Sequence, residues 1–180
     1  MEKMAQIKTR ELNTEEVIEI LENIPQNDVR FALWLEALMG FRISDTMTLT
    51  KEKLKYNNIM LKEKKTGKEN RRELTAEQRE EILDYMLKYD IKFDSSIETF
   101  SRKCQRAIKS ACEKIGLDSS NISTHSFRKY YATTVYSDNK DILLVSKLLN
   151  HSNVAITQRY LGIDKESLKK YSCLNTIKIK

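Results

Sequence analysis

The stretch NNIMLKEKKTGKENRREL, residues 57–74, decides the fold class of this chain of 180 residues. Two short extended runs flank Thr66 and Gly67 within it, a pattern that predicts a β-hairpin. The rest of the chain is expected to be helical, because only one proline and four glycines interrupt the whole sequence. We therefore expect an α+β domain that is mostly helical and carries one small antiparallel sheet.

Capping residues and helical periodicity place the other elements around this hairpin. A helix that opens at Asn13 and one that stops at Gly40 precede the hairpin, and a helix capped by Thr75 follows it. The expected helices cover residues 13–24, 28–40, 75–89, 97–115, 124–137, 141–150 and 154–161. The closing NTIKIK alternates apolar with basic residues, and we expect it to add as a strand to the hairpin of its own subunit or of a neighbour's. A frayed terminus is the alternative.

The composition is that of a globular domain with a basic surface. No apolar run approaches the roughly 18–20 residues of a membrane span, and the N-terminus lacks an apolar signal segment. The net charge of +6 favours a polyanionic partner such as nucleic acid, with a basic solvated surface as the alternative. Cys104, Cys112 and Cys173 form no CxxC pair, and we expect reduced thiols in a cytosolic protein.

The chain has only two histidines, and each lies near an arginine and a tyrosine. The first, in THSFRKYYATT, residues 124–134, precedes an arginine by three positions. On a helix, His125 and Arg128 would share one face, and a cation beside an imidazole suits an anion such as phosphate. A chance His-x-x-Arg is the alternative interpretation.

The second histidine, His151, stands nine residues before Tyr160 in LLNHSNVAITQRYL, residues 148–161. One unbroken helix would place these two side chains on opposite sides. A turn at HSN, with Ser152 or Asn153 capping a new helix, would let them converge. We therefore expect Tyr160 on a short separate helix, with an inward-packed aromatic ring as the alternative.

Together these motifs resemble the catalytic domain of tyrosine recombinases, the phage-integrase family of site-specific recombinases. That family carries an arginine, a lysine, His-x-x-Arg, a histidine or tryptophan, and a nucleophilic tyrosine, in this order. The resemblance spans residues 12–162, and it begins with Arg42 in ALMGFRISDTMTL and Lys65 in KKTGK. The pair His125 and Arg128 comes next, and His151 and Tyr160 complete the pattern.

The resemblance implies strand transfer on double-stranded DNA with no metal and no nucleotide cofactor. Arg42 and Arg128 would clamp the non-bridging oxygens of a phosphodiester as its charge grows. Tyr160 would attack and form a 3′-phosphotyrosine, with His125 accepting its proton or holding the phosphate. His151 would hydrogen-bond a non-bridging oxygen.

Two further assignments depend on the resemblance. Lys65 would protonate the leaving 5′-oxygen, although Lys62, Lys64 and Lys68 crowd the same hairpin and a lysine-rich tip is ordinary on a surface. Asp45 would orient the cations of the site, or would simply face the dipole of a helix that starts at Ser44, just after Arg42.

DNA backbone contacts are expected from three basic residues, Lys68, Arg102 and Lys103. The chain should self-associate on DNA, as a tetramer in synapsis and as a monomer or weak dimer when free, with no membrane partner. Most family members carry an additional N-terminal DNA-binding domain, whereas only about eleven residues precede the first expected helix here. We expect one catalytic domain over 1–180, with 1–11 as a flexible N-terminus and 163–180 as a tail, either natural or cut from a longer recombinase.

Two other functions fit parts of this pattern. A type IB topoisomerase uses similar arginine, lysine, histidine and tyrosine chemistry to relax supercoils, but the compact LLNHSNVAITQRY spacing favours a recombinase. A non-catalytic DNA-binding module is the other alternative, and a decayed site of that kind should have lost some of the motif residues. All of them are present in this chain.

Overall fold

The computed structural model describes residues 9–63 and 67–162. Within this part of the chain the helices and strands follow one another as α1 (Thr14–Glu22), α2 (Asp28–Met39), α3 (Ile43–Thr46), the 3₁₀ helix η1 (Lys51–Leu54), β1 (Asn58–Lys62), β2 (Glu69–Glu73), α4 (Ala76–Lys88), α5 (Ile97–Lys114), α6 (Thr124–Asn139), α7 (Ile142–Leu148) and α8 (Val154–Leu161). The helices dominate, and β1 and β2 pair antiparallel, so the expected α+β class with one small sheet is confirmed.

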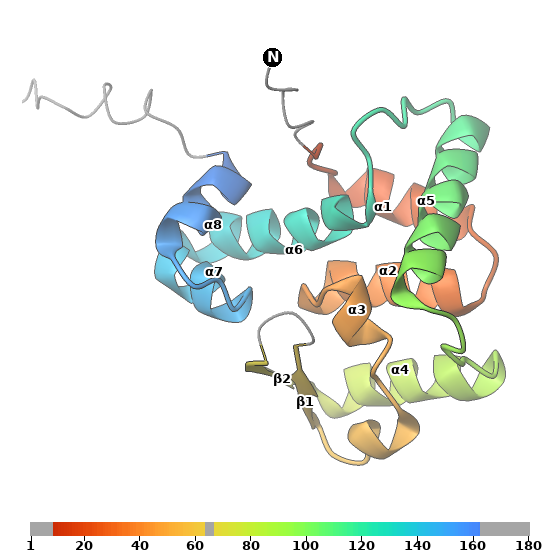
Figure 1. Ribbon diagram of the computed structural model, residues 1–180, viewed down its shortest axis with the longest axis horizontal. Coiled ribbons are helices and arrows are strands. Elements are labelled where there is room, and N and C mark those ends of the chain that lie inside the picture. Colours follow the sequence, from red (N-terminus) through yellow and green to blue (C-terminus); the bar gives the residue numbers. More distant parts are fainter. Residues whose placement is uncertain (1–8, 64–66, 163–180) are drawn as a thin grey trace, which may run out of the picture.

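Helix α2 is the element on which the others assemble. It packs against α1, α5 and α6, and the short α3 follows directly from its C-terminal end. Figure 1 shows α7 and α8 at one end of α6, and α5 at the opposite end of the longest axis of the molecule. The hairpin lies below the α6–α7 end, next to α3 and α4.

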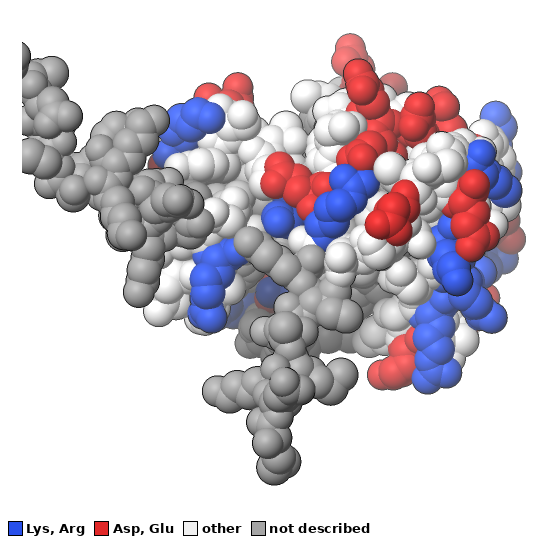
Figure 2. Space-filling view, turned by 90° about the horizontal axis from the view of Figure 1, so that it is seen from above, with Lys and Arg blue, Asp and Glu red and all other residues white. Residues whose placement is uncertain are grey.

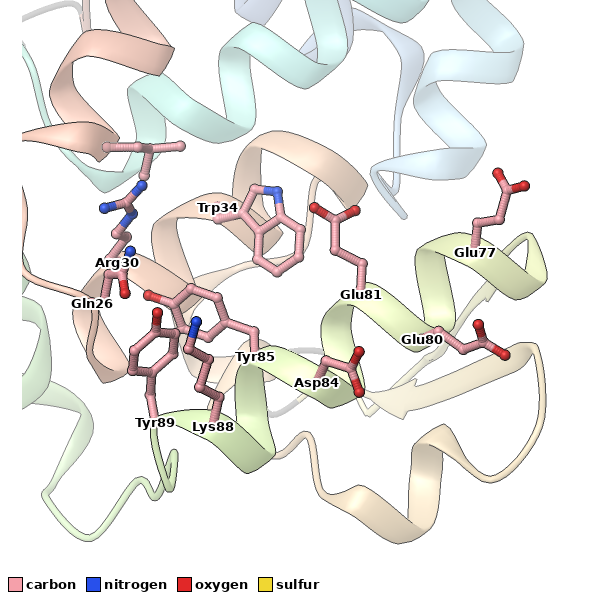
Figure 3. A pocket seen from close by; sticks show the side chains of 11 residues that line it. Gln26, Arg30, Trp34, Glu77, Glu80, Glu81, Asp84, Tyr85, Lys88 and Tyr89 are labelled. Carbon is pink, nitrogen blue, oxygen red and sulfur yellow. The ribbon is translucent and has the colours of Figure 1, made fainter.

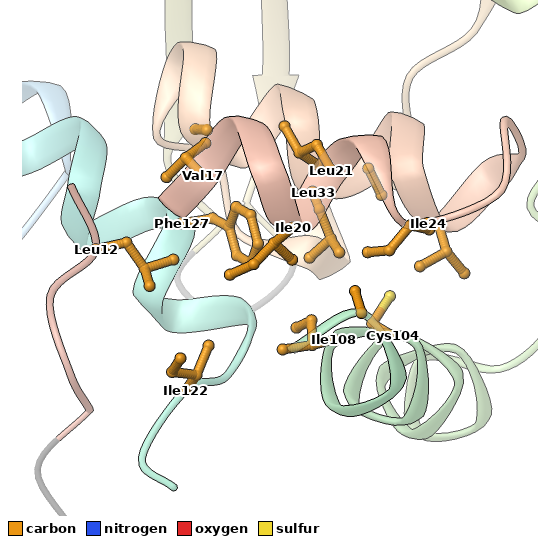
Figure 4. Packing of buried hydrophobic residues seen from close by; sticks show 14 of the residues in the cluster. Leu12, Val17, Ile20, Leu21, Ile24, Leu33, Cys104, Ile108, Ile122 and Phe127 are labelled. Atoms are coloured by element: carbon orange, nitrogen blue, oxygen red, sulfur yellow. The ribbon is translucent and has the colours of Figure 1, made fainter. Parts of the chain in front are cut away.

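Two apolar clusters share α2. The first fills the space between α1, α2, α5 and α6 and includes Ile20, Leu33, Ile108 and Phe127 (Figure 4). The second joins the other face of α2 to the hairpin and α4. Both clusters bury apolar side chains almost completely, so α2 is held on two faces and its C-terminal end is firmly placed.

Local chemistry explains where the main helices begin and end. Asn13 caps α1 and Thr75 caps α4, each in a capping box with the residue three positions on. Gly40 ends α2 at φ +66°, a left-handed conformation that favours glycine. A Cβ at Gly40 would also lie 2.3 Å from the ring of Tyr131, so the close approach of α6 requires glycine there as well.

The inward face of the hairpin is apolar on β1 and polar on β2. Its register runs from Asn58 opposite Glu73 to Lys62 opposite Glu69. On β1 the buried residues are apolar, but on β2 they are Asn70 and Arg72. Those two side chains therefore point toward the rest of the molecule rather than toward solvent.

The expected helices are found with ends that differ by a few residues. The helix after Arg42 begins at Ile43, one residue before the expected Ser44, and lasts a single turn. Thr66, in the expected turn of the hairpin, lies outside the described residues, whereas Gly67 is described. The expected NTIKIK strand and Cys173 also lie outside them. Cys104 and Cys112 are buried free thiols, and no described helix is long and apolar enough to span a bilayer.

Candidate active site

A cavity of about 420 Å³ opens where the ends of α2, α6 and α7 meet the hairpin and α8. Its lining residues are Thr9, Arg42, Lys68, His125, Arg128, Asn150, His151, Ser152, Ile156 and Tyr160. Five of the six residues expected to be catalytic therefore line one cavity, together with the expected DNA contact Lys68. The sixth, Lys65, lies outside the described residues.

Arg128 is built into the floor of this cavity. It projects from α6, is 2% exposed, and donates from Nη1 to the Gly40 carbonyl and from Nη2 to the Leu149 carbonyl at 2.7 Å. Burial, helped by the nearby Arg42, lowers the pKa of Arg128 to about 10. The guanidinium thus keeps its charge at neutral pH while its hydrogen bonds fix its orientation.

Arg42 is held by two buried carboxylates. Its Nη1 lies 2.7 Å from Oε2 of Glu63 and 3.8 Å from Oδ2 of Asp45. Asp45 is thus close to the cation that the resemblance pairs it with, but Glu63 is closer. Sequence reasoning missed Glu63, although a carboxylate at the end of β1, beside the expected catalytic lysine, could have pointed to it.

The turn expected between the second histidine and the tyrosine is present. The Asn153 side chain caps α8 by accepting from the Ala155 amide at 2.8 Å, so α8 is separate from α7. The His151 Nδ1 lies 2.9 Å from the hydroxyl of Thr157, and the His151 and Tyr160 rings meet edge to face at 5.7 Å. The two side chains converge as the expected turn requires.

The phenol of Tyr160 reaches into the start of α6. Its hydroxyl donates to the backbone carbonyl of His125 at 3.2 Å. Burial raises the pKa of Tyr160, and the opposing effect of Arg128 and Arg42 does not cancel that rise. In the DNA-free protein the effect of desolvation on the Tyr160 pKa therefore outweighs that of the two cations, and the phenol stays protonated.

His151 also carries no charge near neutral pH. Burial, with repulsion from Arg128 and Arg42, lowers its pKa to about 4, against a smaller opposing effect of Glu63. With Nδ1 engaged by Thr157, the other ring nitrogen, Nε2, is the atom that a ligand can use. A neutral imidazole can exchange a hydrogen bond with a phosphate oxygen without adding charge.

The other two expected DNA contacts lie away from this cavity. Lys103 on α5 binds both carboxylate oxygens of Asp28 at 2.7 Å, at the start of α2, whereas the cavity is at the end of α2. Arg102 lines a separate depression on α5 with Arg106. The structure therefore brings Lys68 to the cavity but does not bring Arg102 or Lys103 there.

A larger cavity of about 670 Å³ lies between α2 and α4 (Figure 3). Aromatic rings, including Trp34 and Tyr85, form its middle, and the carboxylates along α4 are Glu77, Glu80, Glu81 and Asp84. Those carboxylates would repel a phosphodiester. Figure 2 shows acidic and basic side chains interspersed on the face seen from above Figure 1. The candidate site for nucleic acid is therefore identified by the residues that line the smaller cavity and not by the overall charge.

Comparisons with known proteins find relatives over most of the chain. The model of the phage integrase family matches residues 10–167. A probable integrase/recombinase, YoeC of Bacillus subtilis, is 31% identical over 137 residues, which cover 72% of this chain and 75% of that protein. Tyrosine recombinase XerC of Leptospira interrogans is 26% identical over 171 residues, covering 87% of this chain but only 55% of XerC.

Solved structures show the same fold. The catalytic domain of bacteriophage HP1 integrase is similar with a TM-score of 0.62 and 21% identity, over 94% of this chain and 97% of that domain. A lambda integrase tetramer bound to a Holliday junction gives a TM-score of 0.69 at 19% identity, over 98% of this chain and 53% of that chain. The chain thus spans about half of the longer relatives and nearly all of an isolated catalytic domain.

Proposed function

This chain belongs to the phage integrase family, and from that premise we propose that its cavity cleaves and rejoins double-stranded DNA as a site-specific tyrosine recombinase. One observation carries the proposal: two arginines, two histidines and a tyrosine from four separate parts of the chain line a single cavity. Those five are Arg42, His125, Arg128, His151 and Tyr160.

The arginines supply the electrostatic part of the mechanism. A phosphodiester carries one negative charge, and its five-coordinate transition state carries about two. Arg128 uses two N–H groups on backbone carbonyls and retains others for the non-bridging oxygens, and Arg42 lines the same cavity. Because both guanidinium groups are held before substrate arrives, little reorganisation is required as charge develops.

The nucleophile is the Tyr160 hydroxyl. Since the pKa of Tyr160 is raised by burial, a base must take its proton during attack, and we assign that role to His125, which lines the same cavity. The bond from phosphorus to the 5′-oxygen breaks as the bond to the tyrosine oxygen forms, and Lys65 protonates the leaving oxygen. The products are a 3′-phosphotyrosine and a free 5′-hydroxyl, and religation is the reverse reaction.

The partners we propose are inferred from the relatives. A lambda integrase tetramer binds a Holliday junction, and XerH is bound to its difH substrate, which supports DNA binding and self-association on DNA for this chain. We propose a tetramer in synapsis, a monomer or weak dimer in the free state, and a cytoplasmic location. Lys68, Arg102 and Lys103 stay predicted backbone contacts.

A covalent trapping assay tests the function. A nicked suicide substrate that carries a candidate attachment site should give a protein–DNA adduct, and excess chelator should leave its yield unchanged. Tyr160→Phe should abolish the adduct while DNA binding stays nearly intact, because only one hydroxyl is lost. Tyr56→Phe, at a ring that is 67% exposed, is the matched control and should form adduct normally.

Two results would contradict the proposal. Adduct formation by Tyr160→Phe would show that another residue attacks, and loss of activity in chelator would indicate a metal-dependent nuclease. Relaxation of a supercoiled plasmid without any attachment site would instead favour the type IB topoisomerase alternative.

A further inference from the structure

A chain of polar contacts runs from Arg42 into the hairpin. Arg42 Nη1 lies 2.7 Å from Oε2 of Glu63, and Oε1 of the same carboxylate accepts from Nδ2 of Asn70 at 3.2 Å. The Asn70 oxygen in turn accepts from Nη1 of Arg72. Glu63, Asn70 and Arg72 are each buried, so this path is shielded from water.

Arg72 continues the path to two other segments. Its Nε donates to the carbonyl of Met39 at 2.9 Å, and its Nη2 donates to the carbonyl of Leu148 at 2.6 Å. The guanidinium carbon lies 5.0 Å from the ring centre of Phe41 and 5.7 Å from that of Tyr131. One side chain of β2 therefore joins the end of α2 to the end of α7.

The same two segments are joined a second time by Arg128. Arg128 binds the carbonyls of Gly40 and Leu149, and Arg72 binds those of the residues immediately before them, Met39 and Leu148. The two guanidinium groups thus form adjacent cross-links between the end of α2 and the end of α7. Arg42 follows the first segment and His151 follows the second.

Burying the charge of Arg72 costs desolvation free energy, so an arginine at this position suggests a role that an apolar side chain could not fill. Desolvation opposes the charge of Arg72, as the lowering of its pKa by burial reflects, and an apolar side chain of similar volume could pack between the rings. An apolar side chain could not hold two carbonyls at a fixed separation. A planar group with five donors in a fixed fork can do so.

We propose that Arg72 is a positioning residue for the reaction. Through Met39 and Leu148 it fixes the segment of Arg42 relative to that of His151, and through Asn70 and Glu63 it sets the guanidinium of Arg42. Arg72 is not among the residues that line the cavity, so it acts through these groups and not on the phosphate. This inference rests on the proposed recombinase function.

Single-turnover cleavage tests it. Arg72→Met, which keeps an unbranched side chain between the two rings, should bind DNA within about threefold of wild type but cleave about 100-fold more slowly, the loss that a misplacement of about 1 Å can cause. Arg71→Met is the matched control, because Arg71 is the exposed neighbour on β2 and its guanidinium contacts the sulfur of Met60 on the adjacent strand. It should cleave at the wild-type rate.

A double-mutant cycle separates positioning from general stability. If Glu63→Gln and Arg72→Met act on the same guanidinium, the double variant should cleave little more slowly than the slower single variant. If the rate losses of the two single variants multiply in the double variant, Glu63 and Arg72 act independently and the proposed coupling between them is overturned. Wild-type cleavage by folded Arg72→Met, or an equal loss of DNA affinity and cleavage, would overturn the proposal. If Arg72→Met does not fold, Arg72→Lys, which can reach only one carbonyl at a time, replaces it with the same expected outcome.

A second readout does not depend on activity. In DNA-free protein, amides near residues 39–42 and 148–151 should exchange faster in Arg72→Met than in Arg71→Met. Unchanged exchange in Arg72→Met would overturn the cross-link even if the cleavage assay gave no signal. Absence of any adduct from wild type, with faster exchange in Arg72→Met, would overturn the recombinase function and leave the cross-link standing.

Discussion

At the residue scale, burial opposes the charged form of three ionisable groups, two in the cavity and one on α2. It raises the pKa of Tyr160, raises that of Glu36 well above its usual value, and lowers that of His151. Desolvation always disfavours the charged form, whichever sign the charge has. The two arginines of the cavity thus have the neutral Tyr160 and His151 beside them, while the carboxylates of Glu63 and Asp45 lie against Arg42.

The lowered pKa of His151 predicts a pH dependence of stability. The unfolded chain takes up this proton near pH 6.5, whereas the folded chain takes it up near pH 4, so acidification between these values favours unfolding. Between pH 7 and pH 5 the contribution of His151 should fall by about 2 kcal/mol. Urea unfolding of wild type and His151→Gln at both pH values measures it: wild type should lose about 2 kcal/mol more than the variant. An equal loss of unfolding free energy in both proteins would contradict the prediction. Glu36, whose pKa is raised by burial, has the opposite pH dependence, but it is present in both proteins and cancels in the comparison.

Individual residues differ in how far the sequence could predict them. The resemblance to the recombinase motif pointed to Arg42, the two histidines, Arg128 and Tyr160, and these five residues line one cavity. Glu63, Asn70 and Arg72 were not predicted, because charged and amide side chains on a short strand normally face solvent. Only the packing of the hairpin against α2 and α7 turns that face inward, and no local pattern contains this information.

At the element scale, α8 is a short helix whose start depends on one side chain. Asn153 accepts from the Ala155 amide, and loss of such a cap costs about 1 kcal/mol. Asn153→Ala should therefore make the amides of α8 exchange about fivefold faster, which mass spectrometry can follow. Asn153→Ser should restore protection, and Asn13→Ala, at the cap of α1, should leave α8 unaffected. Unchanged exchange of α8 in Asn153→Ala would show that Thr157 and Tyr160 hold the helix without the cap.

The elements themselves were predictable where they are long or capped. The break between α7 and α8 followed from the nine-residue separation of His151 and Tyr160, since a continuous helix could not bring them together. In contrast, η1 was missed and α3 was placed one residue late. A single turn contains too few residues to display helical periodicity, and its position depends on tertiary contacts.

At the scale of the whole molecule, the cavity of Arg42 and the groove along α4 differ in the charge of the residues that line them. The cavity presents Arg42, Arg128 and Lys68, whereas the groove of α4 presents four carboxylates with Lys88 among its lining. A duplex that approaches the cavity should therefore gain contacts there and avoid the groove. The net charge of +6 alone could not make this distinction.

DNA binding should depend steeply on salt, and one lysine should account for part of that dependence. Lys68→Ala should lower the slope of log affinity against log salt concentration by about 0.9, the value for one lost phosphate contact on B-DNA. Lys88→Ala removes the same charge from the acidic groove and should leave the slope unchanged. Fluorescence anisotropy over a salt series measures both. A tight complex that is insensitive to salt, or equal effects of the two variants, would contradict this prediction.

Gly40 links the length of α2 to the placement of Arg42. It ends α2, its carbonyl accepts from Arg128, and Arg42 stands two residues beyond it. Each residue added to or removed from α2 would rotate the segment after Gly40 by about 100° and shift it by about 1.5 Å. In the divergence of relatives, insertions and deletions should therefore accumulate between α5 and α6, while α2 keeps a constant length even where its sequence changes.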